Sequence, residues 1–278
     1  MARTILITGC SSGMGRAAVA ACRSAGWNVV ATMRNPDDWT GEKEDAGLLV
    51  CALDVTDTAS IDTAFSTAIQ RFGRVDAVVN NAGRGLLSIF EVTPVETIEA
   101  VFATNTFGPM NVMRAAIDHM REAGGGRIIN VTSGSAIVPE PLMSIYSASK
   151  AALDTFTESV MFELAPLGIV LKLIVPGFVP GTSFVEQTQA AAQAVPVPPA
   201  YMSYMTQRLA SYSATSPIAF ATDVDVANAI LAAAGDETDQ FRRLVGPDAA
   251  EFAHMRWETS EIEYAAWTKS RFALSECT

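Results

Sequence analysis

Residues 3–26 read RTILITGCSSGMGRAAVAACRSAG, and this stretch decides the fold. Its first part, Arg3 to Thr8, is a short apolar run typical of a strand buried in a parallel sheet. The run breaks at the glycine-rich turn Gly9 to Gly15, and the helical pattern that follows stops at Gly26. A strand, a glycine turn and a helix in this order direct backbone N–H groups and a helix N-terminus at a phosphate. Because other tight turns also use glycine, the stretch favours a nucleotide site without establishing it.

The same alternation of strands and helices continues along the chain. Strand patterns occupy residues 27–33, 47–55, 75–81, 127–133, 169–176 and 241–246, and helical patterns occupy about 57–72, 95–122 and 144–165. Asp57 is the expected N-cap of the first of these helices. The alternation predicts an α/β fold: a single Rossmann-type, doubly wound parallel sheet of about seven strands, with helices on both faces and one domain over residues 1–278. Ligands of such sheets bind beyond the carboxyl ends of the strands, where Gly9, Asn81 and Ser133 lie.

A tyrosine and a lysine share one face of the helix predicted at 144–165. Tyr146 and Lys150 are four residues apart, so the phenol and the ammonium lie along one side of that helix, thirteen residues or more after Ser133. A phenol titrates near pH 10, and a cation beside it favours phenolate and lowers its pKa. The pattern therefore predicts a general acid/base. The alternative is an ordinary solvated helix face that carries the pair by chance.

These motifs together resemble the short-chain dehydrogenase/reductase family, over about residues 3 to 250. Thr8–Gly15 matches the family's cofactor turn, and Asp54-Val55 matches its adenine contact. Asn80–Gly83 matches its N-N-A-G segment, and Asn105 matches its active-site Asn. Ser133, Tyr146 and Lys150 match its catalytic triad, and Pro176-Gly177 matches its Pro-Gly pair. The phrases LITGCSSG and VVATMR are most similar to the 17β-hydroxysteroid dehydrogenase-like branch.

The resemblance implies hydride transfer between a nicotinamide and a carbonyl or secondary alcohol. Tyr146 would donate the proton in reduction, and the Ser133 hydroxyl would hydrogen-bond the same oxygen. Lys150 would lower the pKa of Tyr146 and hold the nicotinamide ribose, while Asn105 would order a water on a proton path. The protein then supplies geometry and electrostatics, and the cofactor supplies the hydride.

The resemblance also implies the residues that contact the cofactor. They are Gly9, Ser11, Ser12, Gly13, Met14, Gly15, Arg34, Asp54, Val55, Asn81, Ala82, Gly83, Tyr146, Lys150, Pro176, Gly177, Val179 and Thr182. NAD-dependent relatives end their second strand with an acidic residue, whereas Met33 and Arg34 stand here, which favours NADP(H) over NAD(H). In the alternative, Arg34 is an ordinary surface arginine, and Asp37 or Asp38 reaches the ribose. Thr182 comes one residue later than the family pattern, after a second Pro-Gly pair.

The composition argues against several classes of protein. The chain has 278 residues, 49% of them hydrophobic, and a formal net charge of −11, which argues against nucleic acid or an anionic membrane as a partner. Its four cysteines show no paired spacing, and its two histidines are isolated, so we expect no disulfide framework and no catalytic metal. No signal peptide or membrane span is expected, and the predicted location is cytoplasmic. The resemblance implies a homodimer or homotetramer, formed through helices at about 105–122 and 146–166.

The region between Phe184 and Phe220 is rich in Ala, Pro, Met and Tyr and poor in charge. We expect a substrate lid at about 184–220, since a solvated linker would carry fewer apolar side chains. The expected substrate is a fairly bulky hydrophobic ketone or alcohol, and the candidate contacts are Ser135, Met143, Phe184, Tyr201 and Met205. The tail after about 250 has helical spacing. It could cover the pocket mouth, pack between subunits, or pack on its own domain.

Two other classes of function compete with this prediction. A non-catalytic NADP-binding sensor could keep the glycine turn, but the intact set of Asn105, Ser133, Tyr146 and Lys150 argues against it. An epimerase or dehydratase of the related extended group also has Tyr-x-x-x-Lys. Such chains use G-x-x-G-x-x-G, which this turn does not match.

Overall fold

A parallel sheet forms the centre of the computed structural model, which describes residues 2–41, 43–182, 185, 188, 197–213 and 220–272. The strands lie in the order β3-β4-β2-β1-β5-β6-β7-β8. Their bounds are Thr4–Thr8 (β1), Asn28–Met33 (β2), Glu44–Asp45 (β3), Leu48–Ala52 (β4), Ala77–Asn80 (β5), Gly126–Val131 (β6), Ile169–Pro176 (β7) and Arg242–Val245 (β8). All pairs are parallel except β3 with β4. The predicted doubly wound sheet of about seven parallel strands is confirmed. The antiparallel edge strand β3 was not predicted, because a strand of two residues has no recognisable sequence pattern.

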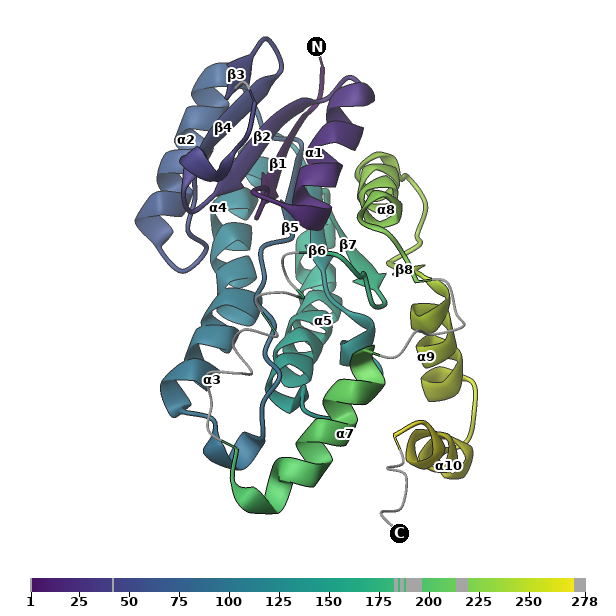
Figure 1. Cartoon of the computed structure of the whole chain (residues 1–278). Helices are drawn as coiled ribbons and strands as arrows, with labels where there is room; N and C mark the ends of the chain where they lie inside the picture. Colours follow the sequence, from purple (N-terminus) through teal and green to yellow (C-terminus); the bar gives the residue numbers. More distant parts are fainter. Residues whose placement is uncertain are drawn as a thin grey trace.

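Helices cover both faces of this sheet (Figure 1). Their bounds are Gly13–Ser24 (α1), Thr58–Phe72 (α2), Val95–Phe102 (α3), Gly108–Glu122 (α4), Ser144–Leu164 (α5), Met202–Ser213 (α7), Asp223–Gly235 (α8), Pro247–Trp257 (α9) and Glu261–Arg271 (α10). Helices α1 and α8 pack together on one face, and α2, α4 and α5 pack on the other. Asp57 caps α2 as predicted, because its carboxylate accepts a hydrogen bond from the Ala59 N–H at 3.0 Å.

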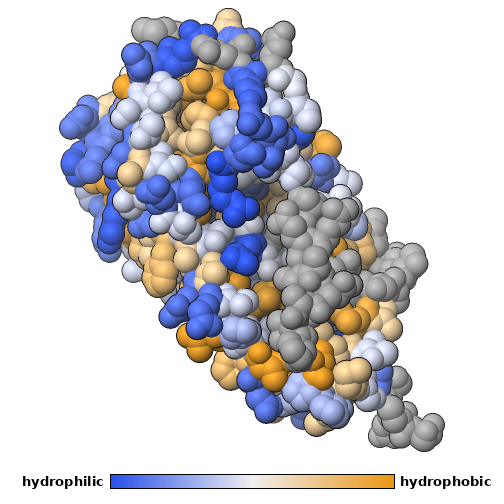
Figure 2. All heavy atoms as spheres, turned by 60° about the vertical axis from the view of Figure 1, so that its left-hand side comes forward, coloured by the Kyte–Doolittle hydropathy of each residue, from blue (hydrophilic) through white to orange (hydrophobic). Residues whose placement is uncertain are grey.

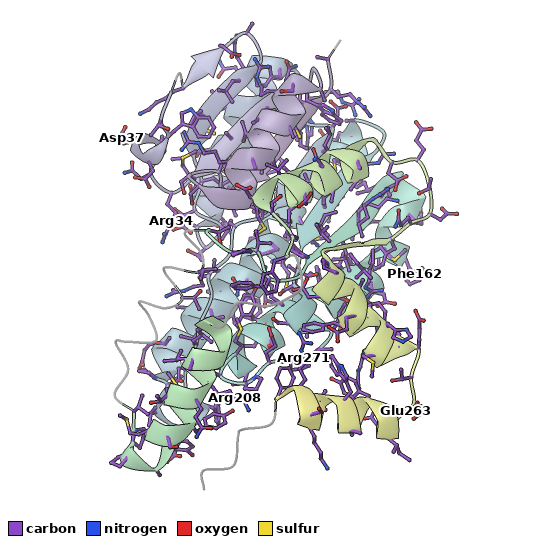
Figure 3. All side chains as sticks on the ribbon, turned by 45° about the vertical axis from the view of Figure 1, so that its right-hand side comes forward. Arg34, Asp37, Phe162, Arg208, Glu263 and Arg271 are labelled. Carbon is purple, nitrogen blue, oxygen red and sulfur yellow. The ribbon has the colours of Figure 1, made fainter. Side chains whose placement is uncertain are left out.

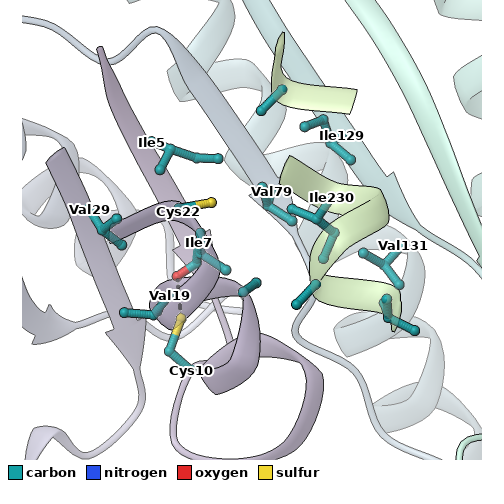
Figure 4. Close-up of a cluster of buried hydrophobic side chains, with 14 of the residues drawn as sticks. Ile5, Ile7, Cys10, Val19, Cys22, Val29, Val79, Ile129, Val131 and Ile230 are labelled. Atoms are coloured by element: carbon teal, nitrogen blue, oxygen red, sulfur yellow. Dashed lines mark hydrogen bonds between the residues drawn. The ribbon is translucent and has the colours of Figure 1, made fainter. Parts of the chain in front are cut away.

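The face under α1 and α8 is a close-packed apolar layer (Figure 4). Ile5, Ile7 and Val79 from the central strands are fully buried against Ile230 of α8. Each such side chain contributes about 1.5–3 kcal/mol relative to an exposed one. Cys10 belongs to this layer, where its thiol donates to the Ile7 carbonyl at 3.1 Å and burial raises its pKa. Cys10 therefore packs the core and has no thiolate character for redox chemistry.

The helix predicted over 95–122 is interrupted in the structure. Residues Ala103–Phe107 form a π-helical turn between α3 and α4. Pro109 has no N–H and cannot donate to the Asn105 carbonyl, so the regular ladder of α-helical bonds is broken at this point. The turn carries Asn105 with its side chain fully buried. The periodicity of apolar residues continues through the turn, which is why the sequence alone indicated one helix.

The C-terminal helices pack on the same domain. Phe252 of α9 is buried against Val138, Leu173 and Val175, and Trp267 of α10 packs on Phe252 with the ring centroids 6.0 Å apart. The tail that the sequence left open thus contributes to the core beside β7. At the end of the molecule where α3 and α7 lie, Figure 2 shows hydrophobic side chains among polar ones on the surface. No helix among the described residues is long and apolar enough to cross a membrane.

Candidate active site

The glycine turn is bonded to the segment that follows β5. The Thr8 hydroxyl accepts hydrogen bonds from the N–H groups of Asn81 and Ala82, both at 3.0 Å. The Asn81 amide in turn donates to the carbonyl oxygens of Thr8 and Gly9, at 2.9 and 3.1 Å. A Cβ on Gly15 would lie 2.2 Å from the Gly9 oxygen, so no other residue fits there. These contacts fix the backbone of the glycine turn at the carboxyl ends of β1 and β5, which is the arrangement that can bind a pyrophosphate.

Ser133, Tyr146 and Lys150 come together at the carboxyl end of β6. Tyr146 and Lys150 occupy the first two turns of α5 and are 6% and 4% exposed. The side chains of Ser133 and Tyr146 are hydrogen-bonded to each other. The Lys150 ammonium donates to the Val131 carbonyl at 2.9 Å, which fixes it beside the last residue of β6. A half-buried hydroxyl, a buried phenol and a buried ammonium therefore lie together.

Burial dominates the pKa values of this group. The pKa of Tyr146 rises to about 12, because desolvation and the negative charge of Glu140 outweigh the hydrogen bond from Ser133. Burial also lowers the pKa of Lys150 to about 8. The sequence predicted a lowered Tyr146 pKa, and the structure has the opposite direction. At neutral pH the phenol is thus protonated, which is the form that a proton donor requires.

Asn105 is hydrogen-bonded to the loop after β5 and to α5, next to Lys150. Its side-chain oxygen accepts from the Arg84 N–H, and its amide donates to the Arg84 carbonyl, both at 2.9 Å. The amide also donates to the Ser149 hydroxyl at 3.0 Å. A Cβ on Gly83 would lie 3.4 Å from the Asn105 oxygen and 3.5 Å from the Lys150 nitrogen, so the three residues are close neighbours. Asn105 therefore anchors the loop after β5 beside Lys150.

One large cavity of about 890 Å³ runs along the carboxyl ends of the strands. Every residue that the sequence assigned to the cofactor lies in its wall, as do Ser133, Tyr146 and Lys150, whereas Asn105 lies behind the wall. Thr182, despite its late position, is 8% exposed and packs against Gly13, since a Cβ on that glycine would lie 3.6 Å from it. A cradle of backbone and small residues of this size fits an extended dinucleotide.

The adenosine end of the cavity carries one arginine. Arg34 lines the cavity after β2 and its positive charge helps to lower the pKa of Asp54, although hydrogen bonds from Thr56 have the larger effect. Asp37 does not reach the cavity, because it is bound to Lys43 at 2.6 Å on the surface. Figure 3 shows Arg34 below Asp37, closer to the level at which the strands end. The arrangement leaves no carboxylate of Asp37 for a ribose hydroxyl.

Only some of the candidate substrate contacts line the cavity. Ser135 and Met143 line the cavity. Met205 packs instead with Leu87 in an apolar cluster, and the Tyr201 hydroxyl donates to Glu91 at 2.6 Å on the surface; neither lines the cavity. The prediction for Phe184 lies outside the described residues. Of the expected lid, Val185, Thr188, Arg208 and Phe220 line the cavity.

The sequence analysis missed several residues in the substrate part of the wall. They come from four separate segments and are Glu140, Phe178, Asp248, Phe252, Arg271 and Phe272. Glu140 had a usable signal, since it lies in the chain between Ser133 and Tyr146. Phe178 directly follows the Pro176-Gly177 motif, whereas Asp248, Phe252, Arg271 and Phe272 are far from every motif and reach the cavity only through the packing of α9 and α10.

Comparison with known proteins shows the family. A family model described as short chain dehydrogenase matches residues 3–193. A short-chain dehydrogenase structure from Streptomyces avermitilis is 31% identical and superposes with a TM-score of 0.77 over 98% of each chain. The chain belongs to the short-chain dehydrogenase family, as its motifs predicted.

Two curated relatives match part of the chain. An uncharacterized oxidoreductase of Schizosaccharomyces pombe is 42% identical over 176 residues, which cover 63% of this chain and 60% of that protein. The 3-ketodihydrosphingosine reductase of Bacteroides thetaiotaomicron is 34% identical over 173 residues, or 62% of each chain. The matches therefore span less than two thirds of these relatives' own length. Neither relative is described as a hydroxysteroid dehydrogenase, so that branch stays a prediction.

More distant structures share the fold with different cofactors. A short chain dehydrogenase from Burkholderia cenocepacia in complex with NADP is 23% identical, with a TM-score of 0.75 over 99% of this chain and 98% of that one. A family member from Burkholderia phymatum in complex with NAD is 24% identical, with a TM-score of 0.77 over 92% and 93%. The fold thus accommodates either nucleotide, and the choice in this chain depends on its own residues.

Proposed function

We propose that this protein is an NADP(H)-dependent oxidoreductase that transfers hydride between the nicotinamide and a ketone or secondary alcohol. The observation that carries the proposal is the group of Ser133 with the buried Tyr146 and Lys150, which lies in the wall of the same cavity as the glycine turn. A non-catalytic NADP-binding sensor would need the glycine turn but would gain nothing from the cost of burying Lys150.

The residues of this group have separate roles in the proposed reaction. When bound, the nicotinamide would supply the hydride. Tyr146, which is protonated at neutral pH, donates its proton to the carbonyl oxygen in reduction. Ser133 donates a hydrogen bond to the same oxygen and stabilises the charge that develops there. Lys150, held by the Val131 carbonyl, places a positive charge next to the ribose, and Asn105 fixes the adjoining loop.

The preference for NADP(H) over NAD(H) rests on the end of β2. Arg34 lines the cavity after β2, and Asp37 is bound to Lys43, so the guanidinium, and not the Asp37 carboxylate, would hold the 2′ substituent of a bound ribose. A guanidinium binds phosphate with two parallel hydrogen bonds. An NAD-preferring dehydrogenase remains the alternative, since NAD complexes occur in the same fold.

Other features support the wider proposal. Leu87, Met143 and Phe178 give the substrate part of the cavity apolar walls, which favours a hydrophobic carbonyl compound of the kind that the hydroxysteroid dehydrogenase-like branch would take. Phe107, directly before α4, and Phe162, on α5, are exposed, and such apolar surface supports a homodimer or homotetramer. Free cysteines among the described residues support a cytoplasmic location.

The substitution Tyr146→Phe tests the proposed function, because it removes one hydroxyl and keeps the ring. We expect NADPH binding, measured by the fluorescence of the nucleotide, to stay within about twofold. Reduction of a panel of steroid, aromatic and aliphatic ketones should fall by about 10²-fold or more, the size of a lost general acid. Tyr264→Phe, outside the cavity, is the matched control and should retain full turnover. Unchanged turnover in Tyr146→Phe would refute the assignment of the acid.

A further inference from the structure

A carboxylate stands in the substrate part of the cavity. Glu140 lines the cavity between Ser135 and Met143, and its Oε2 accepts a hydrogen bond from the Ser135 hydroxyl at 2.8 Å. Burial raises the pKa of Glu140 despite that hydrogen bond. Its negative charge acts on Tyr146, which places it close to the reacting group. Among the described residues Glu140 forms no salt bridge, although the positive charge of Arg271 acts to lower its pKa.

A second carboxylate lies beside it and is incompletely bonded. Asp248, at the start of α9, lines the cavity and is 4% exposed. Its Oδ2 accepts from the Phe178 N–H at 2.6 Å, whereas Oδ1 has no hydrogen-bond partner within the described part of the chain. The charge of Asp248 contributes to the raised pKa of Glu140, so the two carboxylates are near one another. Oδ1 is closed to solvent and packs against Gly177, where a Cβ would lie 1.9 Å from it, so Asp248 acts on this part of the cavity through its negative charge and not as a direct ligand.

The arginines of the same wall already have partners. Arg271 of α10 is bound to Glu251 at 3.1 Å, with its guanidinium 4.9 Å from the ring of Phe252. Arg208 of α7 donates to the Phe272 carbonyl, and Figure 3 shows these two arginines close together where α7 meets the end of α10. The cations therefore hold helices together, while Glu140 retains acceptor capacity. This difference favours a ligand that donates hydrogen bonds over an anionic ligand.

We propose that Glu140, held by Ser135 and flanked by Asp248, binds a hydrogen-bond donor that the substrate carries next to its reacting carbonyl. The substrate class is then a hydroxy- or amino-substituted ketone, or the corresponding alcohol, with an apolar remainder. This inference rests on the proposed function, because it concerns the substrate of the same site. Neither donor needs a covalent step, since a hydrogen bond to the Glu140 carboxylate is enough to hold it.

The test uses four ketones of similar size on one phenyl scaffold. They are α-hydroxyacetophenone, α-aminoacetophenone, α-methoxyacetophenone and benzoylformate, which present a hydroxyl, an ammonium, an acceptor without a donor, and an anion. Dissociation constants are measured by calorimetry with the enzyme saturated by the oxidised nicotinamide nucleotide that it binds more tightly. No ketone can be reduced in that complex, so binding is separated from turnover.

We expect the wild-type protein to bind the hydroxyketone at least about tenfold more tightly than the methoxyketone, and benzoylformate more weakly than either. Glu140→Leu should reduce the tenfold ratio to below about twofold. Glu140→Gln keeps an acceptor without the charge, so it should retain part of the hydroxyl preference and lose any preference for the ammonium. Thermal unfolding checks that both variants fold. Glu91→Gln is the matched control, since Glu91 also accepts from a hydroxyl but lies outside the cavity, and its ratios should equal those of the wild type.

Three results would overturn the subsite. They are equal or no binding of the hydroxy- and methoxyketones, tightest binding of benzoylformate, and a hydroxyl preference that survives Glu140→Leu. Reduction of the same ketones by NADPH and NADH is scored separately. Its absence would count against the proposed function, while the ratio of dissociation constants would still decide the subsite.

Discussion

Burial of Lys150 should make the stability of this protein depend on pH in a way that one substitution removes. Its pKa falls from an ordinary value of 10.5 to about 8, because the ammonium is desolvated beside β6. Below pH 8 the lysine is protonated in the folded and the unfolded chain, and the folded state bears the whole cost of burying the charge. Between pH 8 and 10.5 only the unfolded chain binds this proton, so the free energy of unfolding rises with pH. Above pH 10.5 the cost is gone.

The magnitude follows from the two pKa values. Each pH unit between them corresponds to about 1.4 kcal/mol, so the full effect is about 3 kcal/mol. From pH 7.5 to pH 10 the recovered part is about 2 kcal/mol. Lys150→Met lacks this titration. The lost hydrogen bond to the Val131 carbonyl also destabilises the variant, but by an amount that does not change with pH.

Urea unfolding at pH 7.5 and pH 10 measures the effect. We expect the free energy of unfolding of the wild type, minus that of Lys150→Met, to increase by about 2 kcal/mol between the two pH values. Lys269→Met on α10 is the matched control, because Lys269 is exposed, and its difference should stay constant within a few tenths of a kcal/mol. A constant difference for Lys150→Met as well would show that the ammonium is not desolvated, and the reasoning would be refuted.

Two further predictions concern the cofactor end of the cavity. Arg34→Ala should raise the Michaelis constant for NADPH about tenfold or more and leave that for NADH within about twofold, because only NADPH has a 2′-phosphate; equal changes in steady-state kinetics with the two nucleotides would contradict the pairing. Gly15→Ala places a Cβ 2.2 Å from the Gly9 oxygen, so we expect a loss of about 2 kcal/mol or more in thermal unfolding, with weaker NADPH fluorescence binding. The control is Gly26→Ala, where φ is +81° and the added Cβ meets no atom within 4 Å. We expect it to lose about 1–2 kcal/mol of unfolding free energy and to bind NADPH as the wild type does. Similar losses of NADPH binding in Gly15→Ala and Gly26→Ala would contradict the role of Gly15.

Much of the fold was accessible from sequence because its signals are local. Each predicted strand appears within a few residues of its expected place, and Asp57 caps α2. The interruption at Ala103–Phe107 was not accessible, since the apolar period persists and only Pro109 hints at the broken bond. The edge strand β3 has two residues, which is too short for any pattern to show.

The candidate site divides in a similar way. The glycine turn and the pair Tyr146 and Lys150 depend on backbone conformation and on the helical repeat, both of which residue types and spacing specify. Tyr201 and Met205 had suitable chemistry but lie away from the cavity, because residue type does not reveal the direction in which a helix faces. Phe252 and Arg271 reach the cavity from more than a hundred residues beyond Tyr146, through contacts that no local pattern encodes.

The amino-acid sequence by itself determined the βα alternation, the place of the phosphate turn and the set of reacting side chains, because short-range sterics and periodicity govern these features. Only the tertiary structure decided the direction of the Tyr146 pKa and the presence of Glu140 and Asp248 beside it. Both depend on how much water the assembled core excludes and on which distant charges it brings together, and neither quantity exists until the chain has folded.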